Sequence, residues 1–93
     1  MEKLANVRSN IDRINSEIVA LLIERMKNVD KVAEYKAAHG LPVSVPEREK
    51  SILNKVSQLA GSEYADDIVP VFQAIFAASC HREERKMKSE TIS

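Results

Sequence analysis

The chain has 93 residues, of which 14 are basic and 14 acidic, so its formal net charge is zero. This length predicts one domain over residues 1–93, and a hydrophobic fraction of 44% excludes intrinsic disorder. Balanced charge argues against a nucleic-acid binder. No apolar run approaches the about 20 residues of a membrane span. The chain has one cysteine, Cys80, which excludes an internal disulfide.

The first predicted element is a long helix over about residues 3–39. Gly40 and Pro42 end it, because Gly suits the left-handed position after a last helical turn and Pro cannot continue a helix. Residues 40–46 then form an extended linker. Apolar residues at spacings of three and four form one stripe along the helix: Leu4, Val7, Ile11, Ile14, Ile18 and Leu21.

Two further helices are predicted after the linker. The second covers about residues 46–59, since Pro is tolerated in a first turn, and Gly61 ends it. The third begins within residues 62–67 and runs to about Lys86, and we expect residues 88–93 to form a frayed polar tail. The predicted fold class is therefore all-α, with a long, a short and a long helix.

The first helix is too long for a compact monomer of this size. About 35 residues at about 1.5 Å each span about 50 Å, whereas a compact chain of this length has a diameter of roughly 30 Å. The apolar stripe continues over most of the helix, and a second copy of the chain would cover it. We therefore expect an intertwined helical homodimer.

Charged residues continue the apolar stripe of the first helix. Arg25 continues the seven-residue spacing of Leu4, Ile11 and Ile18. Lys36 comes 11 residues after Arg25, which places it about 20° from the same face of the helix. A cation on an apolar stripe costs desolvation unless an anion meets it, so this pattern predicts an anion-binding groove. Arg8 is about 25 Å from Arg25 along the helix and could approach it only from another chain, in an antiparallel dimer. An ion pair of Arg25 with Glu83 or Glu49 would also fit the pattern, as would a solvated Lys36 at the helix end.

The second and third predicted helices add polar residues to this apolar setting. Arg48 and Glu49 open the second helix, where an ordinary exposed pair would also fit. Ser79 and Glu83 are four residues apart and continue an apolar stripe of the third helix, so a hydroxyl and a carboxyl group lie on an otherwise apolar face. Ser79 would also fit a small packing residue, and residues 81–86 a solvated face.

Signatures of cofactor chemistry are missing from the sequence. His39 and His81 have no metal-ligand spacing to another His or acid, and Cys80 is best interpreted as a small core residue. There is no phosphate-binding loop, no dinucleotide fingerprint and no HExxH motif. We therefore expect no cofactor and no metal. The first ten residues contain no apolar signal-peptide core, which favours a cytoplasmic protein.

Taken in order over about residues 4–86, the charged set resembles the all-helical class of chorismate mutase. The resemblance rests on Val7-Arg8 followed by Ile11-Asp12-Arg13-Ile14, on Leu21-Leu22-Ile23-Glu24-Arg25, Val32-Ala33-Glu34-Tyr35-Lys36, Pro46-Glu47-Arg48-Glu49-Lys50 and Ala78-Ser79, and on Glu83 after them. Members of that class are intertwined homodimers with two sites, each of which receives one arginine from the other chain. They convert chorismate to prephenate, toward phenylalanine and tyrosine, by a pericyclic rearrangement without metal or covalent intermediate.

The resemblance implies a role for each residue of the set. Lys36, Glu83 and Arg25 would be the catalytic residues, with Lys36 donating to the ether oxygen that gains negative charge. Glu49 would accept a hydrogen bond from the ring hydroxyl. Substrate carboxylates would be bound by Arg8 of the partner chain, Arg25, Lys36 and Ser79, with Arg48 supporting the site from the second helix.

The sequence departs from the class at two positions. Many members carry glutamine where this chain has Glu83, and a glutamate can donate to the ether oxygen only when it is protonated. We therefore expect turnover to fall as Glu83 loses its proton with rising pH, and Glu83→Gln to flatten that dependence. Some members also carry an acid at the position of Val45, where a backbone contact could serve instead.

Two other functions fit parts of the same pattern. Isochorismate pyruvate lyase shares the fold and most of the charged set, and the presence of Glu49, which can hold the ring hydroxyl, favours the mutase over it. A non-catalytic helical dimerisation module would explain the long apolar stripe. It would not explain why Arg25, Lys36 and Glu83 share the inside of the fold.

Overall fold

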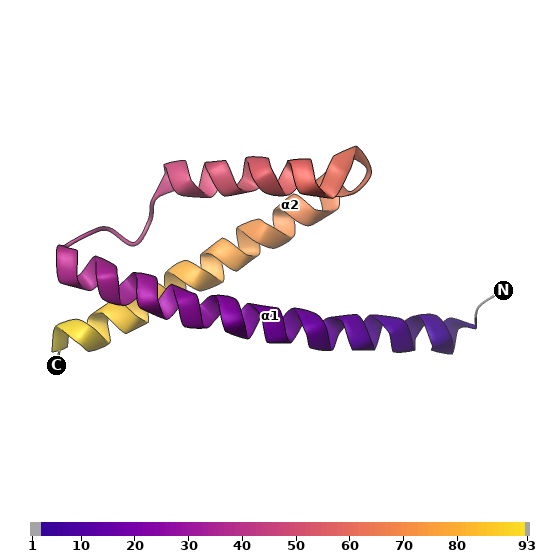
Figure 1. Cartoon of the computed structure of the whole chain (residues 1–93), viewed down its shortest axis with the longest axis horizontal. Helices are drawn as coiled ribbons and strands as arrows, with labels where there is room; N and C mark the ends of the chain where they lie inside the picture. Colours follow the sequence, from indigo (N-terminus) through magenta and orange to yellow (C-terminus); the bar gives the residue numbers. More distant parts are fainter. Residues whose placement is uncertain (1–2, 93) are drawn as a thin grey trace.

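The computed structural model describes residues 3–92, with side chains described through residue 89. Over that part of the chain the structure is all-α and contains two helices, α1 (Leu4–His39) and α2 (Pro46–Ile92) (Figure 1). α2 consists of two helical segments that meet at Gly61, whose backbone is not helical (φ 79°, ψ 165°). The prediction of three separate helices is corrected accordingly. Because Gly adopts positive φ at little cost, one residue redirects the chain and no loop is needed.

The end of α1 is built around Gly40, as predicted. This residue adopts the left-handed conformation (φ 65°, ψ 32°), and the next backbone N–H, that of Leu41, donates to the Lys36 carbonyl at 2.9 Å. This is the hydrogen bond of a Schellman motif, which satisfies a carbonyl group left free by the helix end. The motif fixes the last turn of α1, which carries the Lys36 side chain.

The start of α2 also follows the prediction. Pro46 is its first residue, and the Val45 carbonyl accepts hydrogen bonds from the backbone N–H groups of Arg48 and Glu49 at 3.0 and 3.2 Å. Two charged side chains therefore emerge from the first turn, next to the linker. At the other end, α2 continues to Ile92, beyond the predicted end near Lys86, and Ser93 lies outside the described residues.

The two segments of α2 lie differently against α1 (Figure 1). Residues 46–60 run back along α1 in the opposite direction, and residues 62–92 cross its C-terminal half obliquely. The N-terminal end of α1 extends past both. The molecule is consequently elongated, with extents of 57 × 27 × 14 Å and a radius of gyration of 16.8 Å, whereas a compact chain of this length would have a radius of about 12 Å.

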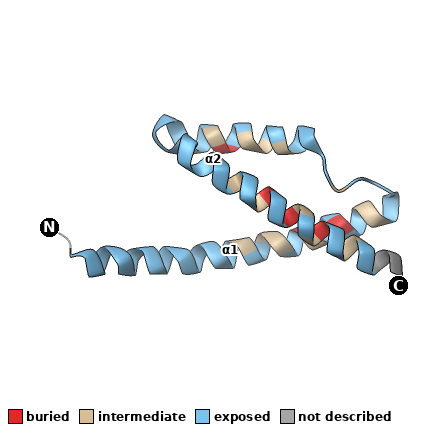
Figure 2. Cartoon of the chain, turned by 180° about the vertical axis from the view of Figure 1, so that it is seen from behind, coloured by how far each residue is buried: buried red, intermediate tan, exposed pale blue. Residues whose placement is uncertain are grey.

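The core is small and lies where the second segment of α2 crosses α1 (Figure 2). Its buried apolar residues are Val29, Ala33 and Phe76, and a further buried residue, Val56, lies on the first segment of α2. Two polar residues, Ser79 and Glu83, are buried with them. Because burying an unpaired polar group is costly, their presence at the centre of the fold directs attention to what they contact.

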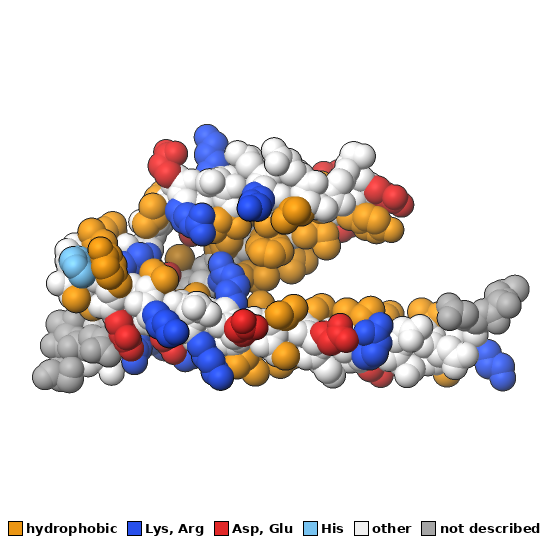
Figure 3. Space-filling view, viewed as in Figure 1, with side chains coloured by type: hydrophobic (Ala, Val, Ile, Leu, Met, Phe, Trp, Pro, Cys, Tyr) orange, Lys and Arg blue, Asp and Glu red, His pale blue; other side chains and the backbone are white. Residues whose placement is uncertain are grey.

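The apolar stripe of the first helix is exposed in the single chain. Leu4 and Leu21, near its two ends, are 62% and 65% exposed, and Ile11 and Ile18 between them are about half exposed. Figure 3 shows hydrophobic side chains along the edge of α1 that faces the first segment of α2. Over the described residues, neither helix offers a stretch apolar and long enough to cross a bilayer.

Candidate active site

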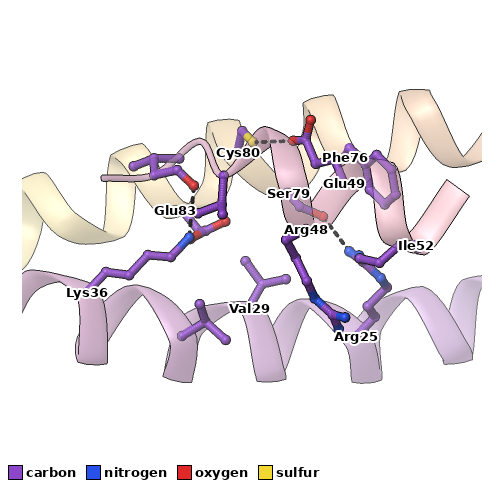
Figure 4. Close-up of a pocket in the computed structure, with 13 residues that line it drawn as sticks. Arg25, Val29, Lys36, Arg48, Glu49, Ile52, Phe76, Ser79, Cys80 and Glu83 are labelled. Atoms are coloured by element: carbon purple, nitrogen blue, oxygen red, sulfur yellow. Dashed lines mark hydrogen bonds and ion pairs between the residues drawn. The ribbon is translucent and has the colours of Figure 1, made fainter. Parts of the chain in front are cut away.

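A cavity of 440 Å³ lies between α1, the linker and both segments of α2 (Figure 4). That volume is typical of sites for small molecules. Six of the seven predicted site residues line it: Arg25, Lys36, Arg48, Glu49, Ser79 and Glu83. Apolar side chains and one thiol complete the wall: Val29, Val32, Val43, Val45, Ile52, Phe76 and Cys80.

Lys36 is held from two sides at the edge of the cavity. Its Nζ atom donates to Glu83 Oε1 and to the Val43 carbonyl oxygen, both at 2.8 Å. The side chains of Lys36 and Glu83 are only 13% and 9% exposed, so the alternative of a solvated lysine is wrong. An ammonium group has three N–H donors, and two are used here. The third remains for a ligand in the cavity.

Arg25 is anchored by a hydroxyl group rather than a carboxylate. Its Nη1 atom donates to Ser79 Oγ at 2.5 Å, and Ser79 Oγ donates in turn to the Ile75 carbonyl oxygen at 2.7 Å. The guanidinium carbon lies 5.9 Å from the centroid of the Phe76 ring, a cation–π distance. Among the described residues, no ion pair forms between Arg25 and either Glu83 or Glu49. The alternative that paired Arg25 with one of them is therefore wrong.

The first turn of α2 supplies Arg48 and Glu49 to the opposite wall. Arg48 is exposed and Glu49 is half-buried. The Cys80 thiol donates to Glu49 Oε1, with an Sγ–Oε1 distance of 3.7 Å. Burial, together with the charges of Glu49 and Glu83, raises the pKa of the Cys80 thiol, so the sulfur keeps its proton at neutral pH.

Sequence reasoning missed the positions of Phe76 and Cys80 in this site. Phe76 lies three residues before Ser79, and Cys80 lies three residues before Glu83, so helical spacing makes each a neighbour of a predicted site residue. That spacing was the available signal. It could indicate proximity to Ser79 and Glu83, but the contacts with Arg25 and Glu49 depend on how α2 bends back at Gly61.

Arg8 is the one predicted site residue that this chain does not bring to the cavity. It is exposed on the N-terminal half of α1 and is absent from the cavity wall. Next to the site, a second cavity of 390 Å³ shares Arg25, Arg48 and Ile52 with the first. Its remaining wall comes from α2: Ser51, Lys55, Val56, Leu59 and Phe72.

A second set of charges fixes the crossing of the helices outside the cavity. Arg82 forms two hydrogen bonds with the Asp30 carboxylate, at 2.6 and 2.7 Å, and Lys86 lies 3.5 Å from Glu34. The hydrogen bond from Arg82 lowers the pKa of Asp30. The interpretation of residues 81–86 as a solvated face is therefore corrected, because part of that face is paired with α1. The described residues contain no cluster of His, Cys, Asp and Glu that could hold a metal ion.

Comparison with known proteins identifies the family of the chain. A model of the family described as chorismate mutase type II matches residues 7–84. The bifunctional chorismate mutase/prephenate dehydratase of Aquifex aeolicus (strain VF5) is 38% identical over 93 residues, which is 95% of this chain and 25% of that protein. The chorismate mutase of Methanocaldococcus jannaschii is 37% identical over 71 residues, which is 76% of this chain and 72% of that protein.

A more distant relative extends over nearly the whole chain. The 4-amino-4-deoxychorismate mutase of Streptomyces venezuelae is 22% identical over 98% of this chain and 90% of its own length. The chain spans about a quarter of the length of the bifunctional relative, and no solved structure gives a significant match. Because the family match covers most of the helices and all the residues of the cavity wall, the chain belongs to the chorismate mutase type II family.

Proposed function

We propose that this chain is a chorismate mutase that rearranges chorismate to prephenate, as a cytoplasmic enzyme of phenylalanine and tyrosine biosynthesis. The observation that carries the proposal is the convergence of Arg25, Lys36 and Glu83 on one cavity of small-molecule size. In a structural helix pair such charges would be costly to bury. In a site for a dianion they are useful, and membership of the family supports that interpretation.

The charge of the cavity wall fits a substrate with two carboxylates. Three cations, Arg25, Lys36 and Arg48, share the wall with two acids, Glu49 and Glu83. With Glu83 protonated, the wall carries a net charge of +2, which balances a dianion. Arginine presents a planar fork that matches a carboxylate, and the Arg25 guanidinium is oriented by Ser79 and Phe76 before a ligand arrives.

The reaction needs geometry and charge stabilisation rather than a nucleophile. Chorismate must adopt a compact diaxial shape so that its two reacting carbons meet, and a shaped cavity contributes by holding that shape. As the ether bond breaks, negative charge gathers on its oxygen. The free N–H of Lys36 would donate to that oxygen, in a site where a preorganised donor is effective because it needs no rearrangement.

Glu83 and Glu49 take different parts in this proposal. Glu83 would be the second donor to the ether oxygen, which requires that it carry a proton when substrate is bound. In the unliganded chain it instead accepts a hydrogen bond from Lys36, so substrate binding would have to be accompanied by proton uptake. Glu49 would accept a hydrogen bond from the ring hydroxyl.

We propose further that the active form is a homodimer to which Arg8 contributes across the interface. The exposed apolar stripe on the N-terminal half of α1 supports this, because a second copy would bury it. The 390 Å³ cavity beside the site, with Leu59 and Phe72 in its wall, is a place for such a copy to pack. Arg8 from that copy would complete the anion-binding set.

Mixing two inactive variants tests the shared site. Arg8→Ala and Arg25→Ala homodimers should each be impaired at both sites. In a mixed dimer, one site would have Arg25 from one chain and Arg8 from the other, so refolding a mixture should restore about a quarter of wild-type activity. Two impaired variants that show no restoration on mixing, although they exchange subunits, would contradict the proposed dimer.

The reaction itself is tested by offering the purified chain chorismate, isochorismate and 4-amino-4-deoxychorismate in parallel. Chorismate should disappear with formation of prephenate, and kcat/KM should fall about 10²- to 10³-fold in Arg25→Ala, the loss expected when a preorganised charged donor is removed. Arg85→Ala is the matched control, because Arg85 is exposed and lies outside the cavity. It should keep wild-type activity.

Other products would identify other functions. Pyruvate release from isochorismate, without prephenate formation, would make the chain an isochorismate pyruvate lyase. Turnover of 4-amino-4-deoxychorismate alone would place it with the Streptomyces relative. If none of the three substrates reacts and none raises the melting temperature, the helical dimerisation module is the better explanation.

A further inference from the structure

One contact in the cavity joins two residues that the sequence keeps far apart. Glu49 lies in the first turn of α2 and Cys80 lies 31 residues later, in its second segment. Both side chains line the 440 Å³ cavity, and Figure 4 shows the thiol directed toward the carboxylate. The Sγ–Oε1 distance of 3.7 Å is that of a hydrogen bond from sulfur.

The chemistry of the contact defines which group donates. Burial raises the pKa of the Cys80 thiol first of all, and the charges of Glu49 and Glu83 raise it further. A thiolate would be the third negative charge in this small space. The sulfur therefore keeps its proton, and the S–H group can only donate to a neighbouring carboxylate.

Glu49 has few other constraints. Within residues 3–89 no other side chain donates a hydrogen bond to its carboxylate, and Arg48 beside it is exposed. A glutamate side chain loses considerable rotamer freedom when it is fixed. A single anchored oxygen restricts that freedom before substrate binds and leaves the second oxygen able to accept. Because a thiol is a weak donor, it orients the carboxylate without satisfying it.

We propose that Cys80 is a positioning residue for Glu49, which it holds in the orientation needed to accept the ring hydroxyl of the substrate. The inference rests on the proposed function for the part played by Glu49, and on the structure alone for the contact. Cys80 touches no reacting atom. Its effect should therefore appear only while Glu49 is present.

A pair of substitutions separates the donor from the shape of the side chain. Cys80→Ala removes the S–H group and should lower kcat/KM about three- to tenfold, the range expected for the loss of one hydrogen bond. Cys80→Ser keeps a donor and should lose less kcat/KM than Cys80→Ala, because the Glu49 side chain has few other constraints and can approach the hydroxyl by the roughly 1 Å that separates the two hydrogen-bond lengths. Equal losses in both variants would overturn the proposal.

A double-mutant cycle tests whether Cys80 acts through Glu49. Glu49→Ala removes the group that is positioned, so adding Cys80→Ala to it should cause no further loss in kcat/KM. If the effect of Cys80→Ala is the same in both backgrounds, Cys80 acts on packing alone and the proposal fails. Where Glu49→Ala leaves too little turnover, binding of an unreactive cyclic dicarboxylate by calorimetry replaces kcat/KM in the cycle.

A spectroscopic measurement tests the contact without any turnover. Because the chain has a single cysteine, its infrared S–H band and its alkylation rate report on Cys80 alone. Glu49→Gln should shift the S–H band and lower the pH at which iodoacetamide begins to react with Cys80. Glu47→Gln is the control, because Glu47 is exposed and lies outside the cavity. An unchanged thiol in Glu49→Gln would show that the contact is absent.

The two proposals can fail separately. If wild-type protein turns over none of the three substrates while Glu49→Gln changes the thiol as expected, the proposed function is wrong and the Cys80–Glu49 contact stands. If wild-type protein makes prephenate while the thiol does not respond to Glu49, the mutase stands and the positioning role is wrong.

Discussion

Glu83 connects the stability of the fold to the proposed chemistry, so its replacement has two predicted consequences. Its carboxylate forms a buried ion pair with Lys36, with the two side chains 9% and 13% exposed. Glu83→Gln keeps an oxygen acceptor and loses the charge. The free energy of unfolding should fall by about 1 kcal/mol. This is the difference between a hydrogen bond to a charged group (about 1.5–3 kcal/mol) and a hydrogen bond between neutral groups (about 0.5–1.5 kcal/mol).

Glu83→Ala should be much more damaging to stability. It leaves the Lys36 ammonium group with only the Val43 carbonyl as a partner, and removing one member of a buried pair costs about 3–5 kcal/mol. At roughly 4–8 °C per kcal/mol for a domain of this size, the melting temperatures of the two variants should differ by more than 8 °C. Thermal unfolding followed by circular dichroism measures both.

The consequence for activity is a change in the pH profile. If Glu83 must be protonated to donate to the ether oxygen, kcat/KM of wild-type protein should fall with rising pH. The amide of Gln donates at any pH, so Glu83→Gln should give a flat profile. A variant that declines with pH as steeply as wild type would refute the role of Glu83 as a proton-bearing donor.

Two further predictions concern the crossing of the helices and the bend in α2. The hydrogen bond from Arg82 lowers the pKa of Asp30 from its ordinary value of 3.8, so the pair stabilises the fold above that value and the stabilisation is lost as pH falls through the lowered pKa. Asp30→Asn should therefore narrow the difference between the urea midpoints measured at neutral and at acidic pH. Asp67→Asn, at an exposed position, is the control and should leave that difference unchanged. Equal narrowing in both variants would contradict the stabilising role of the Asp30–Arg82 pair. Gly61→Ala should lower the free energy of unfolding by about 1–3 kcal/mol, because the backbone angles of Gly61 (φ 79°, ψ 165°) are almost exclusive to Gly. Gly40→Ala should lower it by about 1 kcal/mol, because the left-handed angles of Gly40 (φ 65°, ψ 32°) are open to other residues at a smaller cost. Urea unfolding that finds Gly40→Ala the more damaging would be inconsistent with the backbone geometry.

The sequence predicted those features that depend on one helix at a time. Arg25 and Lys36 belong to a single straight helix, where a rotation of about 100° per residue places each side chain reliably. The prediction that both enter one groove is confirmed by the cavity they line. The end of α1 at Gly40 was equally predictable, because a left-handed residue followed by Pro is a local signal.

Partner choice across the helices could not be read from the pattern. Periodicity indicates that Arg25, Lys36, Ser79 and Glu83 face inward, but not the register in which they meet. The pairs depend on the bend at Gly61, since one backbone residue sets the angle at which the second segment crosses α1. Lys36 consequently meets Glu83 and Arg25 meets Ser79, whereas the pattern alone allowed Arg25 to pair with an acid.

The residues that build the proposed site are also those that limit the core. Among residues 3–89 only four apolar residues are buried, and Ser79 and Glu83 are buried as well. A buried ion pair such as Lys36–Glu83 is often no more stable than apolar residues of the same volume, and by about 1–4 kcal/mol it can be less so. Stability alone would therefore favour replacing the ion pair.

A chain that keeps the pair, and leaves a 36-residue helix half uncovered, must obtain the missing burial elsewhere. A second copy packed on the exposed stripe would supply both that burial and the remaining arginine, which is why we expect dimerisation and catalysis to be lost together.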